Sequence, residues 1–151
     1  MSVRTWGEFA KEEPDLAAFG AELLLGAQVA YLATVRPDGV PRVHPVTPIL
    51  TDEGLFLFME PTSPKGHDLR SGSGYSMHNA VPDMNGTGGE FIVSGKGFAV
   101  EDEQTRATVS DAARYKPVDR YVLFELKLAE ARCNGYGDVQ LPATRRWSAA
   151  S

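Results

Sequence analysis

The chain of 151 residues is 42% hydrophobic and 23% charged, a composition typical of one ordinary globular domain spanning residues 1–151. Its formal net charge of −5 argues against a nucleic acid or an anionic membrane as partner, so a bound anion must be held by local cations. No apolar run approaches the roughly 18 residues needed to span a bilayer. The single cysteine, Cys133, cannot form an internal disulfide, so we expect a cytoplasmic protein.

Two short helices are predicted at the N-terminus. Thr5-Trp6-Gly7-Glu8 matches a capping box, in which Thr5 caps a first helix and the Glu8 side chain reaches back to it. Pro14 starts a second helix. Its apolar residues recur at helical spacing, and they are Leu16, Phe19, Leu23 and Leu24. This stripe predicts a helix that lies on a larger core.

A β-hairpin follows, because residues 30–35 are rich in strand-forming side chains and residues 36–39, RPDG, form a turn sequence. The returning strand, residues 41–50, contains three prolines, which lack the N–H that a sheet ladder needs. We therefore expect one edge of this strand to be free to face a ligand. Residues 55–59, LFLFM, are apolar without alternation, as in a strand covered on both faces.

A candidate phosphate site lies where this apolar strand leads into a helix. Ser63 is expected to be the N-cap of the helix and Pro64 its first residue. Lys65 adds a full positive charge to the positive end of the helix macrodipole. A helix start of this kind is suited to a phosphate group.

Arg42, which follows the hairpin turn, is the second cation expected at this site. Alone it would more often be a solvated surface charge, but together with Lys65 and Ser63 it is better explained by a shared phosphate. His44 lies two residues further on, so its side chain shares a strand face with that of Arg42. His44 can contact the ligand or be a structural histidine, and the sequence leaves both interpretations open.

The second half of the chain contains four further predicted elements. These are strands over residues 75–80, 91–100 and 121–131, and a weakly amphipathic helix over residues 102–114. Gly95 and Gly97 interrupt the second of these strands, which predicts a bulge or a sharp barrel corner. The tail from residue 134 has no periodicity. Six strands in sequential hairpins, with short helices at the periphery, predict an α+β protein built on a six-stranded antiparallel barrel.

Other chemistries find little support in the sequence. Three histidines are spread over positions 44, 67 and 78 without the spacing of a metal site. Ser63, His67 and Asp68 are neighbours on one helical turn and cannot form a nucleophile–base–orienter chain. Gly95-Lys96-Gly97 lacks the remaining residues of a Walker loop. We therefore expect no metal, and we assign no catalytic side chain.

Three segments together resemble the pyridoxamine 5′-phosphate oxidase-like group of FMN-binding split-barrel proteins. They are YLATVRPDGVPRVHPV, LFLFMEPTSPKGHDLRSGSGYSMH and EFIVSGKGFAV, and they cover most of residues 29–100 in the order and spacing of the family. The resemblance implies a split β-barrel homodimer with FMN bound at the subunit interface and a small molecule as substrate.

The resemblance also implies roles for individual residues. Arg42 matches the strand arginine that contacts the flavin phosphate, and Ser63 and Lys65 match the polar and basic phosphate-binding pair. The segment Val43, His44 and Pro45 matches the backbone that edges the flavin ring. Phe58 and Met59 match strand positions beside the ribityl chain and the ring.

The chain departs from the true oxidases at three places. Pro64 occupies the position of an arginine, Glu90 stands near the position of a flavin-contacting glutamine, and Arg145-Arg146-Trp147 does not reproduce the substrate-phosphate motif. The resemblance therefore does not extend to pyridoxine phosphate as the substrate.

The sequence thus predicts an FMN-dependent oxidoreductase of unknown substrate. A flavin accepts or donates hydride on its own ring, so the protein needs no nucleophile of its own. Three alternatives remain open, namely a reductase that uses the deazaflavin F420, a non-catalytic protein that binds or sequesters flavin, and a degenerate dimeric barrel that binds no cofactor.

Overall fold

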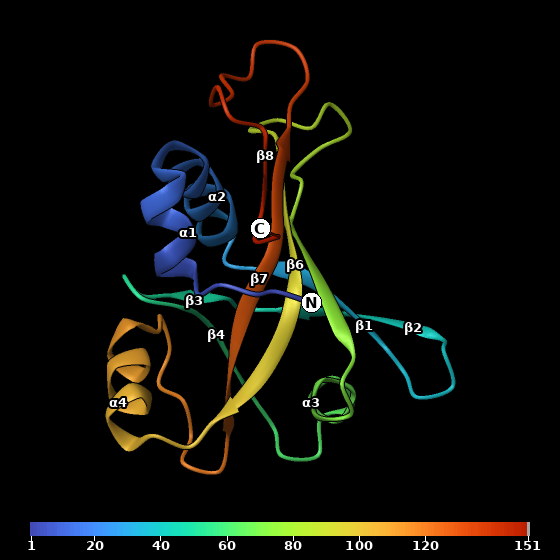
Figure 1. Ribbon diagram of the computed structural model, residues 1–151, viewed down its shortest axis with the longest axis vertical. Helices are drawn as coiled ribbons and strands as arrows, with labels where there is room; N and C mark the ends of the chain where they lie inside the picture. Colours follow the sequence, from blue (N-terminus) through green and yellow to red (C-terminus); the bar gives the residue numbers. More distant parts are fainter. Residues whose placement is uncertain (151) are drawn as a thin grey trace.

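The computed structural model describes residues 1–150, which form four helices and eight strands (Figure 1). The helices are α1 (Trp6–Glu12), α2 (Pro14–Gly26), α3 (Pro64–Arg70) and α4 (Glu103–Ala112). The strands are β1 (Ala30–Val35), β2 (Pro41–Val46), β3 (Ile49–Leu50), β4 (Leu55–Met59), β5 (Gly74–Asn79), β6 (Glu90–Val100), β7 (Val122–Asn134) and β8 (Arg146–Ser148).

All the strands belong to one antiparallel sheet in the order β2-β1-β5-β6-β7-β4-β3, with β8 added to β7. The outermost strands, β2 and β3, follow one another in the chain and are joined only by Thr47 and Pro48. The sheet must therefore curl until its two ends approach each other, and the helices lie outside it (Figure 1). The predicted α+β split-barrel fold is confirmed.

The sheet has two more strands than the six that the sequence predicts. The predicted strand over residues 41–50 is divided into β2 and β3 at Thr47 and Pro48, which belong to neither strand, whereas Pro41 and Pro45 are tolerated within β2 because it is an edge strand. The tail also contributes β8, whose residues pair with Glu130, Ala131 and Arg132 of β7. β8 has three residues, too few for a periodic pattern to be recognised.

The N-terminal capping box is confirmed. The Glu8 amide donates a hydrogen bond to Thr5 Oγ1 at 3.1 Å, and the Thr5 amide donates one to Glu8 Oε1 at 2.8 Å. The helix begun in this way buries Trp6, whose ring makes edge contacts with Phe9 and Phe91. None of the helices within residues 1–150 is long and apolar enough to cross a membrane.

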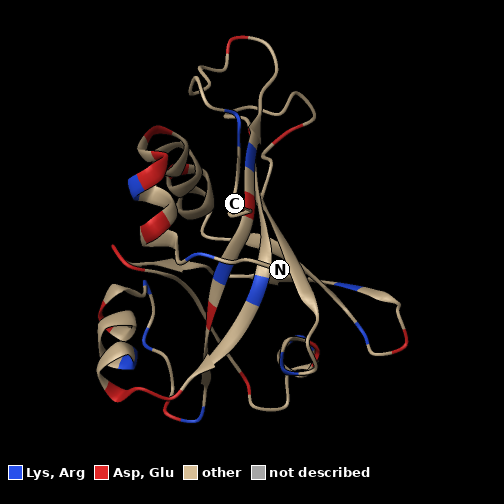
Figure 2. Cartoon of the chain, in the orientation of Figure 1, with Lys and Arg blue, Asp and Glu red and all other residues tan. Residues whose placement is uncertain are grey.

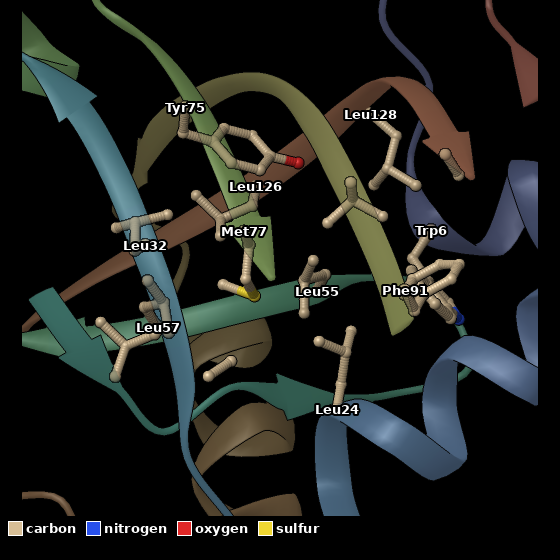
Figure 3. Packing of buried hydrophobic residues seen from close by; sticks show 14 of the residues in the cluster. Trp6, Leu24, Leu32, Leu55, Leu57, Tyr75, Met77, Phe91, Leu126 and Leu128 are labelled. Carbon is tan, nitrogen blue, oxygen red and sulfur yellow. The ribbon is translucent and has the colours of Figure 1, made fainter. Parts of the chain in front are cut away.

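β4 is buried on both of its faces, as its uninterrupted apolar sequence predicts. Leu55, Leu57 and Met59 belong to the main core inside the curled sheet, part of which is drawn in Figure 3. Phe56 and Phe58 point to the other side and pack with Val109 of α4. β4 thus separates two apolar clusters, and its last residues reach the start of the loop before α3.

A bulge is found where the sequence predicts one, at the glycine-containing strand β6, although the extra residue lies on its partner β7. The register against β7 shifts between Ser94 and Gly95, which leaves one extra residue, Ala129, on β7. A Cβ atom at Gly95 would lie 1.9 Å from the carbonyl oxygen of Lys127, so only glycine fits this position. The bulge increases the local twist, which helps the long strands β6 and β7 to curl.

Candidate functional site

The proline-containing strand β2 lies at one end of the sheet and pairs with β1 along one side only. Within residues 1–150 no strand pairs with its other side, so the predicted free edge is confirmed. Arg42 and His44 are half-buried, whereas Val43 points away from the core and is 64% exposed. Pro45 is also exposed. The side chains of Arg42 and His44 therefore share the inner face of an accessible edge.

The start of α3 places Lys65 beside Ser63. Ser63 holds the N-cap position as predicted, but its hydroxyl does not cap the helix and instead accepts a hydrogen bond from Lys65 Nζ at 2.9 Å. α3 packs closely on β4, because a Cβ atom at Gly66 would lie 2.8 Å from the sulfur of Met59. Burial lowers the pKa of Lys65 below its ordinary value. The amine has no carboxylate partner among the described residues that would raise the pKa again.

A hollow of about 240 Å³ lies next to this lysine. Four of the predicted site residues line it, namely Pro45, Phe58, Met59 and Lys65. The remaining lining residues were not predicted from the sequence, and they are Val46, Thr47, Glu60, Tyr115 and Tyr121. The two tyrosines follow α4 in the chain and carry no local pattern, so only the packing of that segment against β4 reveals them.

Arg42 does not lie free in solvent but forms an ion pair with Asp68 of α3. Its Nε donates to Asp68 Oδ2 at 2.8 Å, and a second, longer contact of 3.4 Å joins Nη2 to Oδ1. Thr34 of β1 donates its hydroxyl to the same Oδ2 at 2.7 Å. Burial raises the pKa of the Asp68 carboxyl, but these two hydrogen bonds and the charge of Arg42 outweigh burial and bring the pKa below its ordinary value.

Sequence reasoning missed the role of Asp68. The residue is separated by 26 positions from Arg42 and by 34 from Thr34. A fully buried carboxylate is rare unless it is paired, and the sequence gives no sign that Asp68 is buried. Only the packing of α3 against β1 and β2 brings the three residues together.

His44 lies within electrostatic reach of Arg42, Lys65 and Asp68. Burial, followed by the charges of Lys65 and Arg42, lowers the pKa of His44, and Asp68 only partly opposes them. Within residues 1–150, His44 Nε2 is buried and has no hydrogen-bond partner. A buried polar atom without a partner is uncommon and is consistent with a site that a ligand completes. We refer to Arg42, His44, Ser63 and Lys65 below as the cradle.

The fold does not bring Glu90 to the cradle of the same chain. Glu90 begins β6, three strands away from β2, where its carboxylate pairs with His78 at 3.3 Å and accepts a hydrogen bond from the Tyr136 hydroxyl. Followed across the paired strands β2, β1, β5 and β6, Arg42 is in register with Gly95 of β6. Glu90 lies five residues before Gly95 on β6, which is about 17 Å along the strand.

A larger hollow, of about 710 Å³, lies between α2 and the chain segments near residues 85–88 and 136–140. It contains none of the predicted site residues, and its lining includes two carboxylates, Glu22 and Asp138, but neither lysine nor arginine. This lining does not suit a phosphate. Lysine and arginine are dispersed over several elements of the chain (Figure 2), so the cradle is a local feature. In the described part of the chain, no group of three or more His, Cys, Asp or Glu side chains could hold a metal ion.

Comparison with solved structures shows which fold this is. The chain is 19% identical to a heme binding protein from Mycobacterium smegmatis, with a TM-score of 0.64 over 87% of this chain and 58% of that one. It is 20% identical to a protein from Lactobacillus delbrueckii that is provisionally named a pyridoxamine 5′-phosphate oxidase, with a TM-score of 0.57 over 79% and 90% of the two chains. HutZ, the heme storage protein of Vibrio cholerae, gives a TM-score of 0.62 at 19% identity over 83% and 96%. At these identities the likeness concerns the fold alone.

Among curated proteins, none matches the chain. The sequence pattern that defines the pyridoxamine 5′-phosphate oxidase family, in contrast, matches residues 18–134, which run from α2 to the end of β7 and contain the whole cradle. Because this match covers well over half of its length, the chain belongs to the pyridoxamine 5′-phosphate oxidase family and has the FMN-binding split-barrel fold.

Proposed function

We propose that this protein is an FMN-dependent oxidoreductase that acts on a small molecule in the cytoplasm. The observation that carries the proposal is the Lys65–Ser63 contact at the start of α3, beside a hollow that is also lined by Phe58 and Met59. Lysine and serine supply a charge and a hydroxyl for a phosphate, and the neighbouring apolar walls suit a planar ring.

The residues of the cradle fit the phosphate end of FMN. Lys65 has no carboxylate partner among the described residues, His44 Nε2 has no partner, and Arg42 uses only part of its guanidinium to bind Asp68. When bound, FMN supplies hydride or electron transfer, so the protein has to bind and orient but needs no nucleophile. This agrees with the lack of a recognisable triad in the sequence.

We further propose that the functional unit is a homodimer with the flavin between its two chains. A hollow of about 240 Å³ can enclose only part of a flavin, and the edge of β2 beside it is open. Glu90 lies far from Arg42 within one chain, so a contact between Glu90 and the same flavin requires a second chain.

The purified protein tests the cofactor most simply. We expect a yellow protein, or one that takes up added FMN with one flavin per chain, as followed by visible absorption and equilibrium dialysis. A protein that ignores FMN but binds F420 is a deazaflavin reductase of the same fold. Since two of the similar structures are heme proteins by name, hemin is titrated in parallel. A Soret band that shows one heme bound per chain, without uptake of flavin, contradicts the proposal.

Flavin binding alone does not establish an enzyme. We expect bound FMN to be reduced by a nicotinamide donor and to be reoxidised by an added acceptor, which stopped-flow absorption records directly. If FMN binds but no donor reduces it, the protein is a flavin carrier and the oxidoreductase proposal is wrong.

A further inference from the structure

The Arg42–Asp68 pair connects the cradle to the protein interior. The side chain of Asp68 is 0% exposed and that of Arg42 is 27% exposed, so the guanidinium extends from a fully buried carboxylate to the surface. Arg42 donates from Nε and from one proton of Nη2 to Asp68, so its other Nη protons are available to a ligand. Thr34 donates its hydroxyl to the same carboxylate oxygen, Oδ2, that accepts from Arg42 Nε.

Within one chain, the charges of the cradle and of Asp68 can be counted. Asp68 is ionised at neutral pH because the hydrogen bonds from Arg42 and Thr34 bring its pKa below the ordinary value against the effect of burial. Arg42 and Lys65 contribute two positive charges and Asp68 removes one, which leaves one net positive charge. His44 adds none at neutral pH, since burial and the neighbouring cations lower its pKa. Glu60, on the rim, is paired with Arg120.

We propose that Asp68 sets the ligand charge that the cradle accepts, so that a flavin with a phosphodiester is held at least as tightly as one with a phosphomonoester. A diester carries one negative charge, which the cradle matches. A monoester carries nearly two at pH 8, and the second charge loses part of its hydration without a cation to offset the cost. The inference rests on the proposed flavin site and specifies the head group of its cofactor. Asp68 acts here through Arg42, so it is a positioning residue.

Three flavins with the same ring test the inference on the unmodified protein at pH 8. They are riboflavin, FMN and the monomethyl ester of FMN, which is a phosphodiester. We expect both phosphorylated flavins to bind more tightly than riboflavin, and the methyl ester to bind as tightly as FMN or more tightly. An FMN affinity about tenfold above that of the methyl ester shows that the cradle prefers two charges and overturns the inference.

Asp68→Asn tests the cause of this selectivity. The variant loosens Arg42 and weakens both phosphorylated ligands, but it also removes a negative charge near the phosphate. The ratio of FMN affinity to methyl ester affinity should therefore rise by about tenfold, the effect of one unit charge within about 7 Å. Thr34→Val removes a hydrogen bond to the same oxygen without changing any charge, so it should leave the ratio unchanged. An unchanged ratio in Asp68→Asn, or an equal rise in Thr34→Val, contradicts the role given to Asp68.

Failure of this inference can be told apart from failure of the proposed function. If none of the three flavins binds, the flavin site itself is wrong. If FMN and its methyl ester bind but the ratio of their affinities does not change in Asp68→Asn, the flavin site stands and only the charge selection is wrong. Should Asp68→Asn fail to fold, the affinities of the three flavins for the unmodified protein still show whether the cradle prefers one ligand charge or two.

Discussion

Asp68 is the residue on which the geometry of the cradle depends. Its carboxylate is fully buried and is satisfied by Arg42 and Thr34. Removing one partner of a buried pair leaves the other without compensation, and this usually costs more than the intact pair contributes. The network is therefore expected to affect both the stability of the fold and the orientation of Arg42.

The stability of the protein should depend on the ionisation of Asp68. Because the pKa of Asp68 is lower in the folded chain than in the unfolded one, the pair confers its full stability above the unfolded pKa of about 4. That stability is lost as the pH falls through the lower folded pKa, where the native carboxylate also takes up a proton. We expect Asp68→Asn to lower the free energy of unfolding by about 2–3 kcal/mol at pH 7, and by progressively less below pH 4.

Urea unfolding between pH 3 and pH 7 measures this difference. Asp111→Asn is the matched control, because Asp111 is an exposed residue of α4 whose carboxylate has no ion-pair or hydrogen-bond partner among the described residues. A destabilisation by Asp68→Asn that stays the same at every pH would show that the charge of Asp68 is not the cause.

Individual elements follow their local sequence signals closely in this chain. The capping box at Thr5, the hairpin turn before β2 and the apolar run of β4 were each predicted from adjacent residues, and each is found in the structure. β8 was missed because a strand of three residues depends on its partner β7 rather than on its own sequence. The position of Ser63 was predicted correctly, but the bond made by its hydroxyl was not, since Lys65 competes for it.

The bulge between β6 and β7 provides a test at the level of one element. Gly95→Ala places a Cβ atom against the carbonyl oxygen of Lys127, so the bulge has to rearrange. We expect a loss of about 2 kcal/mol or more in the free energy of unfolding. Gly26→Ala, at the end of α2, meets no atom within 4 Å and should be neutral or gain up to about 1 kcal/mol. Equal effects of the two substitutions in thermal or urea unfolding would contradict the account of the bulge.

The whole molecule presents one apolar face that a second chain could cover. On the outer side of the hairpin, Tyr31 lies opposite Pro45 and Val35 opposite Pro41, with Val43 between them. Tyr31 and Val35 are each 46% exposed, and β2 forms the free end of the sheet. No signal within the sequence reveals which of these residues face outward, because this follows from the register of β1 and β2.

The proposed homodimer can be tested through Val43. Val43→Lys would bury an unpaired ammonium in the interface, and we expect it to raise the dimer dissociation constant by about 100-fold or more in sedimentation experiments. Met84→Lys is the matched control, because Met84 is 98% exposed and lies in a loop away from this face. A wild-type protein that sediments as a monomer at micromolar concentration, or equal effects of both substitutions, would contradict the dimer through this face.

In the proposed flavin site, Arg42 and Lys65 hold the phosphate of the cofactor. Flavin fluorescence titrations with FMN and riboflavin test it in the wild type, in Lys65→Gln and in Arg42→Gln/Lys65→Gln. A double variant with the same change of charge, Lys11→Gln/Arg132→Gln, is the control, because both residues are exposed outside the cradle. Two charge-assisted contacts predict a loss of about 100-fold in FMN affinity in the double variant, about tenfold in the single one, and little change for riboflavin. Equal losses for FMN and riboflavin would contradict the claim that these two residues hold a phosphate.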